Sequence, residues 1–61
     1  MPEKTIEIYQ CDMNGVLISR DVPVKVVEMI AKGLVLPFMQ DVQCFRYHFR
    51  ENGNFYQVNR R

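Results

Sequence analysis

The residue types that most often carry out chemistry are scarce in this chain, and their spacing is unfavourable for it. The single histidine, His48, follows Cys44 by four residues, a separation that two metal ligands or a nucleophile and its base can have. In a strand, side chains at this spacing share a face but lie about 13 Å apart, because each residue advances the chain by about 3.3 Å. That distance prevents both direct contact and shared coordination of a metal ion. Only a helical segment would bring the pair together, and the alternation of aromatic residues around it predicts a strand.

The other candidates for catalysis or metal binding are also weak. Including Cys11 gives two thiols and one imidazole, fewer ligands than a closed structural zinc site requires unless a carboxylate completes the set. The seven acidic residues show no pairing, the three glycines are isolated, and no Ser, His and Asp are spaced as a catalytic triad. A chain of 61 residues also has little core in which to enclose a catalytic pocket. The sequence therefore predicts a non-enzymatic protein with no catalytic residue, no metal site and no cofactor.

A candidate binding surface does emerge from residues 41–61. Within this stretch Asn52-Gly53 separates two runs rich in aromatic residues, which predicts a hairpin with a two-residue type I′ turn that sets Phe49 opposite Tyr56. Because side chains alternate along a strand, one face of this hairpin is apolar and the other is basic and aromatic. The apolar face carries Phe45, Tyr47, Phe49, Tyr56 and Val58, and the opposite face carries Cys44, Arg46, His48, Arg50, Phe55, Gln57, Asn59 and Arg61.

From the basic and aromatic face we single out five residues as the binding site, namely Arg46, His48, Arg50, Phe55 and Arg61. Arginine and aromatic side chains are common anchors of protein–protein interfaces, so this surface favours a protein partner. The alternative is RNA or single-stranded DNA, where arginines neutralise phosphates and the aromatic ring stacks on a base. The net charge of +1 is small for a dedicated nucleic-acid binder. A further interpretation is that these side chains only solvate the outer face of a half-buried sheet.

The elements that must hold this surface begin with a hairpin near the N-terminus. Residues 5–11 alternate and are rich in β-forming residues, so they predict a strand. Residues 12–15 (Asp-Met-Asn-Gly) have the composition of a type I turn followed by a bulge in which the glycine is left-handed. This loop sets Gln10 opposite Ile18 and gathers four aliphatic residues on one face, namely Ile6, Ile8, Val16 and Ile18.

A helix is predicted between the two hairpins. Asp21 can cap it, Pro23 is tolerated in its first turn, and Gly33 is well placed to end it. Apolar residues recur at helical spacing along one side: Val22, Val26, Met29, Ile30 and Gly33, with Val27 and Ala31 widening the stripe. The valines give this helix a low intrinsic propensity, so packing must stabilise it. A strand through residues 22–27 is the alternative, although Pro23 disfavours a central position in a sheet.

The uninterrupted apolar stretch at residues 34–39 has two interpretations. It is either a connector or short strand buried under the sheet, or an exposed patch used for dimerisation or for docking a partner. Pro37 requires any strand here to lie at a sheet edge or to end by Leu36.

Together these elements predict one small α+β domain over residues 1–61, with the element order β-β-α-β-β. Its two layers are a four-stranded antiparallel sheet and one helix packed on it. A chain of this size buries only about 60% of its unfolded surface, so its core is thin and self-association as a homodimer is favoured.

The cellular setting follows from what the chain lacks. Two cysteines are too few for the disulfide framework of a small secreted domain, and no N-terminal signal or long apolar run is present. We therefore expect a cytoplasmic protein with no membrane partner. The function we favour is a small regulator or inhibitor that acts by binding another protein. Nucleic-acid binding ranks second, and a self-assembling structural subunit ranks third.

Overall fold

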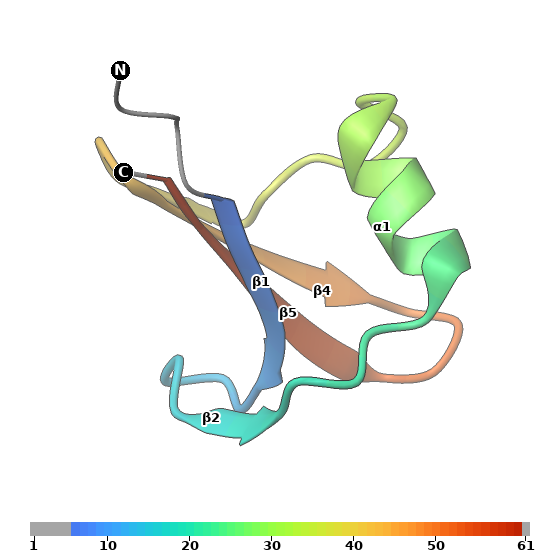
Figure 1. Cartoon of the computed structure of the whole chain (residues 1–61), viewed down its shortest axis with the longest axis horizontal. Helices are drawn as coiled ribbons and strands as arrows, with labels where there is room; N and C mark the ends of the chain where they lie inside the picture. Colours follow the sequence, from blue (N-terminus) through green and yellow to red (C-terminus); the bar gives the residue numbers. More distant parts are fainter. Residues whose placement is uncertain (1–5, 61) are drawn as a thin grey trace.

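A computed structural model describes residues 6–60 of the chain as one helix and a five-stranded antiparallel sheet (Figure 1). The strands are β1 (Ile6–Cys11), β2 (Leu17–Ser19), β3 (Met39–Gln40), β4 (Cys44–Phe49) and β5 (Asn54–Arg60). The helix, α1 (Val24–Ala31), packs on one face of the sheet. The strands are ordered β2-β1-β5-β4-β3 across the sheet, so β5 is central. The predicted α+β class, with a helix on an antiparallel sheet, is confirmed.

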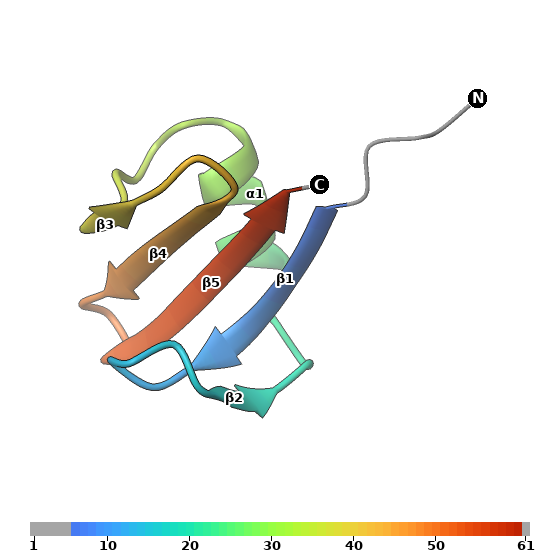
Figure 2. The same cartoon turned by 90° about the vertical axis from the view of Figure 1, so that its left-hand side faces the viewer.

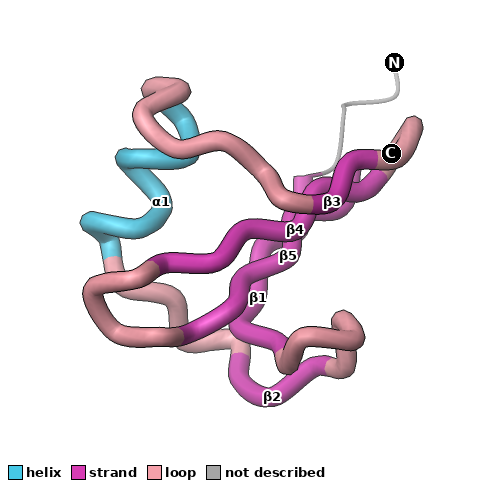
Figure 3. The backbone as a smooth tube through the Cα atoms, turned by 180° about the vertical axis from the view of Figure 1, so that it is seen from behind, coloured by secondary structure: helices cyan, strands magenta, loops and turns pink. Residues whose placement is uncertain are grey.

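The number of strands differs from the prediction, because the described residues form five and not four. The additional strand, β3, is only two residues long, and its Met39 lies opposite Arg46 of β4. Main-chain hydrogen bonds flank it: the Phe38 N–H donates to the Arg46 carbonyl oxygen (2.9 Å) and the Asp41 N–H donates to that of Cys44 (2.7 Å). Figure 3 shows the chain leaving α1 and returning to the sheet beside β4. Pairing with β4 gives the main-chain groups of this segment their hydrogen-bond partners. The composition of the segment does not reveal which strand supplies them, so the predicted four-stranded sheet did not include β3.

The C-terminal hairpin has the predicted faces but a different turn. Its loop spans residues 50–53, so that Phe49 lies opposite Asn54 and not Tyr56. A type I′ turn needs positive φ at both central residues, and among the described residues the positive φ values belong to glycines alone. Asn52 instead uses its side chain, whose Nδ2 donates to the Tyr56 hydroxyl (3.1 Å) and whose Oδ1 accepts the Asn54 N–H (3.0 Å). The pairing is displaced by two residues, which is the period of a strand, so each side chain keeps its predicted face.

The hydrophobic core lies between α1 and the sheet face that it covers. Its buried members are Val26 from the helix and Tyr47, Phe49, Tyr56 and Val58 from β4 and β5. Phe49 and Tyr56 meet edge to face, with ring centroids 5.4 Å apart. Partly buried residues pack around them, namely Ile8, Val22, Met29, Ile30, Val35 and Phe45. The predicted apolar face of the C-terminal hairpin and the predicted helix stripe therefore meet in the core. Ile6, predicted to share a face with Ile8, is instead 64% exposed, because no described strand flanks this end of β1 on its outer side.

The N-terminal hairpin confirms the glycine turn and the predicted register beside it, where Cys11 lies opposite Leu17, but not the predicted pairing beyond Cys11. Gly15 has a φ of 87°, as a left-handed bulge residue requires. Further along, a second irregularity places Gln10 opposite Ser19 and not opposite Ile18. Figure 1 shows β2 well away from α1, so the helix does not cover the β2 side of this hairpin. The aliphatic residues on that side therefore remain exposed, namely Val16, Leu17 and Ile18.

The two ends of α1 give opposite outcomes. The N-cap is Pro23, with no side-chain hydrogen bond, so the predicted capping by Asp21 is wrong. Asp21 lies two residues before the cap, beyond reach of the first-turn N–H groups, and its own N–H donates to Ser19 Oγ (3.1 Å). Gly33 ends the helix as predicted, with a φ of 71°. The Gly33 N–H donates to the Ile30 carbonyl oxygen (3.1 Å), and the Leu34 N–H donates to that of Met29 (2.9 Å). This pair of hydrogen bonds is a Schellman motif.

The apolar stretch at residues 34–39 alternates between the core and solvent. Val35 packs against the core, whereas Leu34, Leu36 and Phe38 are exposed. The prediction of a buried connector is therefore wrong for these three residues. A domain of two layers has no third layer that would cover the outer side of this segment.

Candidate functional site

The sheet face opposite α1, which we call the open face, carries a network of polar side chains. It is built from alternate residues of three strands, because Tyr9 and Arg46 both lie opposite Gln57 of the central strand. Arg46 Nε donates to Gln57 Oε1 at 3.1 Å. Gln57 Nε2 in turn donates to the Tyr9 hydroxyl (2.9 Å) and to Asn59 Oδ1 (3.0 Å). These hydrogen bonds explain how the polar Gln57 can be only 8% exposed.

The loop of residues 12–16 folds over part of this network. Asp12 closes the loop, since its Oδ1 accepts two N–H groups of the loop at 2.8 and 3.0 Å. Arg46 Nη1 donates to the Met13 carbonyl oxygen at 3.4 Å. Gly15 lies so close to the Arg46 guanidinium that a Cβ at this position would collide with it. The glycine therefore serves two purposes, because it permits both the positive φ and this close approach.

The cysteines and the histidine are not grouped for catalysis or metal binding. Cys11 lies under the loop at 1% exposure. Burial raises the pKa of the Cys11 thiol, while the Arg46 guanidinium acts in the opposite direction. Cys44 and His48 both belong to β4, four positions apart, as the sequence predicts. Within residues 6–60, no three His, Cys, Asp or Glu residues are grouped in a way that could hold a metal ion.

Three aromatic side chains on the open face form what we call the aromatic cluster: Phe38, His48 and Phe55. His48 lies opposite Phe55 on the neighbouring strand, and their rings stack with centroids 4.3 Å apart and planes 10° from parallel. Phe38 meets Phe55 edge to face at 5.7 Å. Phe55 is half-buried between its two neighbours, whereas Phe38 and His48 are exposed. The cluster therefore presents ordered aromatic surface to solvent.

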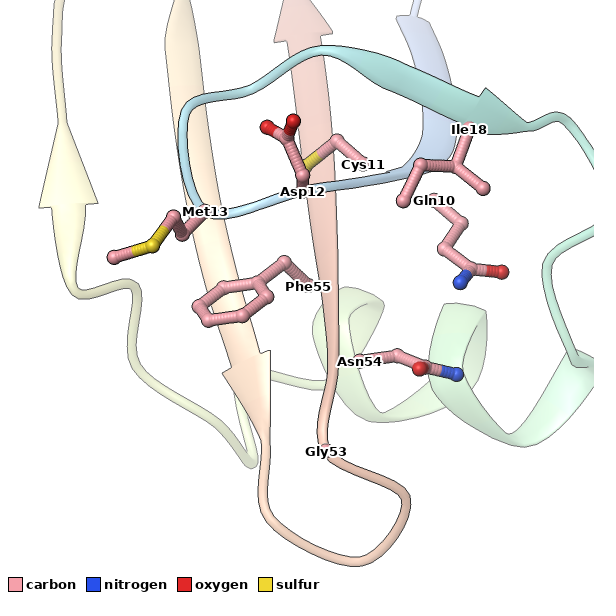
Figure 4. A pocket seen from close by; sticks show the side chains of 8 residues that line it. All are labelled: Gln10, Cys11, Asp12, Met13, Ile18, Gly53, Asn54 and Phe55. Carbon is pink, nitrogen blue, oxygen red and sulfur yellow. The ribbon is translucent and has the colours of Figure 1, made fainter.

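An open pocket of about 330 Å³ adjoins the aromatic cluster. It lies between the two hairpins and is lined by Gln10, Cys11, Asp12, Met13, Ile18, Gly53, Asn54 and Phe55. Figure 4 shows Met13 and Phe55 on one side of the pocket and Gln10 and Ile18 on the other. Because Phe55 belongs to both the pocket and the aromatic cluster, a partner that fills the pocket also touches the cluster.

The structure brings three of the five predicted binding residues together. Arg46 and His48 project from β4, and Phe55 projects beside them from β5. Arg50 lies in the loop after β4 and is exposed, and Arg61 lies outside the described residues. Arg46 is half-buried and engaged by hydrogen bonds within the chain, so its guanidinium stabilises the loop over the network.

Two residues of the site were not predicted from the sequence, namely Phe38 and Met13. Phe38 lies in the apolar stretch before β3 and reaches the cluster only because β3 pairs with β4. Met13 reaches the pocket only because its loop folds back over the open face. The available signal for both was an apolar residue in a turn or connector, which does not by itself indicate a neighbour distant in the sequence.

No family model, curated protein or solved structure matches this chain. In the part of the chain that the structure describes, the helix is too short to span a membrane.

Proposed function

We propose that this protein is a small non-enzymatic regulator or inhibitor that binds another protein through its open face. The main support is the aromatic cluster beside the pocket, in which Phe38 is 54% exposed and His48 is also exposed. Exposed apolar surface next to a hollow is typical of interaction sites. Aromatic anchors that enter or flank such hollows carry most of the binding free energy in many interfaces.

The order within this surface favours tight binding. Stacking holds His48 and Phe55 in place, and the loop that carries Met13 is tied to Arg46. Side chains that are already ordered lose little conformational entropy on binding, so more of the contact free energy appears as affinity. In this proposal Phe55 and His48 are the anchors, Arg50 contacts the partner at the rim, and Arg46 supports the site from beneath.

The second candidate is binding of RNA or single-stranded DNA through the same face. It is favoured by the flat stack of His48 on Phe55, which offers a ring to a nucleobase, and by the exposed Arg50 in the adjoining loop. It ranks second because Arg46 is already engaged within the chain and the net charge is only +1. Few phosphates would be neutralised, so affinity at physiological salt would be low.

We also propose that the protein acts as a homodimer in the cytoplasm. Large apolar side chains remain exposed on both the helix and the sheet, which supports association. Both cysteines, Cys11 and Cys44, are free, as is usual in a reducing compartment. A structural subunit that only assembles with itself is the third candidate, and for it we expect self-association without any other partner.

The test is affinity capture from the native host, with the unmodified protein and two variants as baits, each with and without nuclease. Phe55→Ala removes the residue that the pocket and the aromatic cluster share. Val42→Ala is the control, since Val42 is also apolar and is 88% exposed, but lies in the turn before β4, away from the pocket and the cluster. A captured protein should then be titrated against all three. We expect Phe55→Ala to weaken binding by about 30-fold, which corresponds to about 2 kcal/mol, and Val42→Ala to leave it unchanged.

Other outcomes have distinct meanings. Capture that disappears with nuclease, together with oligonucleotide affinity that falls with salt by a slope of about −0.7 per neutralised phosphate, would replace this proposal with the nucleic-acid candidate. A protein partner bound equally well by Phe55→Ala and by the parent would refute the assignment of the open face.

A further inference from the structure

The described residues contain a second apolar hollow, on the side of the sheet that carries α1. It has a volume of about 290 Å³ and is lined by Ile6, Ile8, Val27, Ile30, Ala31 and Val58. We call it the α1–β1 groove. Figure 2 shows α1 behind the sheet, and the groove is lined by residues of α1, β1 and β5 on this covered face, whereas the aromatic cluster lies on the open face. Every lining side chain is aliphatic.

The α1–β1 groove borders the hydrophobic core. Val58 belongs to the buried core, and Ile8 and Ile30 pack against it. Farther out, Ile6 is 64% exposed and Val27 is 39% exposed. Apolar side chains at the edge of the core therefore meet water in this groove, and this contact is unfavourable in proportion to the apolar area exposed.

The helix contributes a row of exposed apolar residues to the same region. Val24, Val27 and Ala31 are separated by three and four positions, so they lie in line along α1. This row lies beside the buried stripe that contains Val26, and all three members are exposed. One apolar row of α1 packs against the sheet, whereas the other row remains in contact with solvent. Covering this second row with another apolar surface would be favourable.

The strand beside the groove also has an unpaired main-chain edge. Strand β2 pairs with β1 only at Gln10 and Cys11, so no described strand flanks Ile6 and Ile8 on that side. The Asp12 N–H points to the β2 side, where it donates to the carbonyl oxygen of Val16, the residue before β2, at 3.0 Å. Because N–H directions alternate along a strand and β1 pairs with β5 without interruption, those of Ile8 and Ile6 point toward the free edge.

We infer that a second copy of this chain covers the α1–β1 groove, by antiparallel pairing of β1 with β1 across a two-fold axis. Centring the axis at Glu7 sets Ile6 opposite Ile8 of the second copy and joins the two sheets into one. Both helices then lie on the same side of the joined sheet, and the row containing Val27 faces its counterpart. This inference rests on the proposed homodimer and identifies its interface.

A second copy fits this surface better than an unrelated protein because the surface is complementary to itself. An antiparallel strand offers the same pattern of donors and acceptors to a rotated copy of itself. On the open-face side of this edge, Arg20 forms an ion pair with Glu7 at 3.0 Å. The pair presents both signs of charge, so the rotated copy can place each arginine near the carboxylate of the other chain. The Arg20 charges thus offset the repulsion between the two Glu7 carboxylates near the axis.

The first test is sedimentation velocity of the full chain from about 1 to 500 µM, a range that spans weak and tight dimers. We expect the parent to reach twice the chain mass of 7.3 kDa. Val27→Glu places a carboxylate in the interface and should weaken dimerisation at least ten-fold, because a charge buried without a partner is strongly unfavourable. Glutamate has a higher helix propensity than valine, so a change in mass cannot be attributed to a weakened helix. Val27→Leu, which keeps the row apolar, should remain dimeric.

The control is Leu36→Glu, at a residue that is 84% exposed in the apolar stretch after α1. We expect this variant to dimerise like the parent. A dimer that Leu36→Glu disrupts and Val27→Glu does not would place the interface in the apolar stretch and overturn the inference. A protein that stays monomeric at the highest concentration would also overturn it, and would leave binding through the open face to be decided separately by Phe55→Ala.

Hydrogen exchange gives a second readout that does not depend on any variant. Pairing of the two β1 strands protects the amides of Ile6 and Ile8, whereas the amide of Glu7 already faces β5. Raising the protein concentration should therefore slow exchange at Ile6 and Ile8 and leave amides away from β1, such as that of Val42, unchanged. A dimer that forms without any slowing at these two amides would show that the edge of β1 is not part of its interface.

Discussion

Substitution of Gly15 by alanine tests the close contact between the 12–16 loop and the open face. Gly15 has a φ of 87°, and an added Cβ would collide with the Arg46 guanidinium and lie 2.7 Å from Gln57 Oε1. Neither neighbour can move freely, because Arg46 Nε donates to Gln57 Oε1 at 3.1 Å. Gly15→Ala should therefore displace the loop, break this hydrogen bond, or both.

The expected loss of stability has two parts. A left-handed backbone costs an alanine about 1–2 kcal/mol. The hydrogen bond between Arg46 and Gln57 contributes about 1 kcal/mol, and steric crowding at Gly15 removes much of it. The free energy of unfolding should thus fall by about 2–3 kcal/mol. For a domain of this size, that corresponds to a decrease in Tm of roughly 10–20 °C.

The chain provides a matched control for the backbone part. Gly53 has a similar φ of 71°, but a Cβ built there meets no atom within 4 Å. Gly53→Ala should therefore show only the backbone cost, about 1–2 kcal/mol. Thermal and urea unfolding followed by far-UV circular dichroism measure both variants against the parent. Equal losses for the two would refute the argument that Gly15 is required by its contact with Arg46 and Gln57.

Two further predictions concern the core and the buried thiol. Phe49→Ala should lower the free energy of unfolding by about 3–5 kcal/mol, because Phe49 is buried against Tyr56 in a thin core, and a melting temperature within a few degrees of the parent would contradict this. Burial raises the pKa of the Cys11 thiol in the folded chain above its ordinary value of 9.0. The neutral thiol's contribution to the free energy of unfolding is therefore complete below pH 9.0, and it is lost as the pH rises through the folded-state pKa. We therefore expect the urea midpoint of the parent to fall above pH 9, and that of Cys11→Ala to fall less. A disulfide reagent should modify Cys44 well before the buried Cys11 in the native protein.

The amino-acid sequence alone determined which side chains share a face of the C-terminal hairpin. Alternation places Phe49 and Tyr56 on one side and His48 and Phe55 on the other, and this assignment survives the incorrect turn. An error of two residues in register equals one full strand period, so it moves residues along the sheet without turning them over. Local backbone requirements were equally readable, since Gly33 ends the helix through its own positive φ.

Only the tertiary structure decided where the strands end, what covers them and which distant residues meet. The loop after β4 has four residues because the Asn52 side chain bonds the Tyr56 hydroxyl, a contact that competes with the turn its sequence favours. The aliphatic residues around Ile18 stay exposed because α1 does not extend over β2. Phe38 joins the aromatic cluster because the strand that follows it pairs with β4. Periodicity is a local property of the chain, whereas cover and contact depend on the free energy of packing segments that are far apart in the sequence.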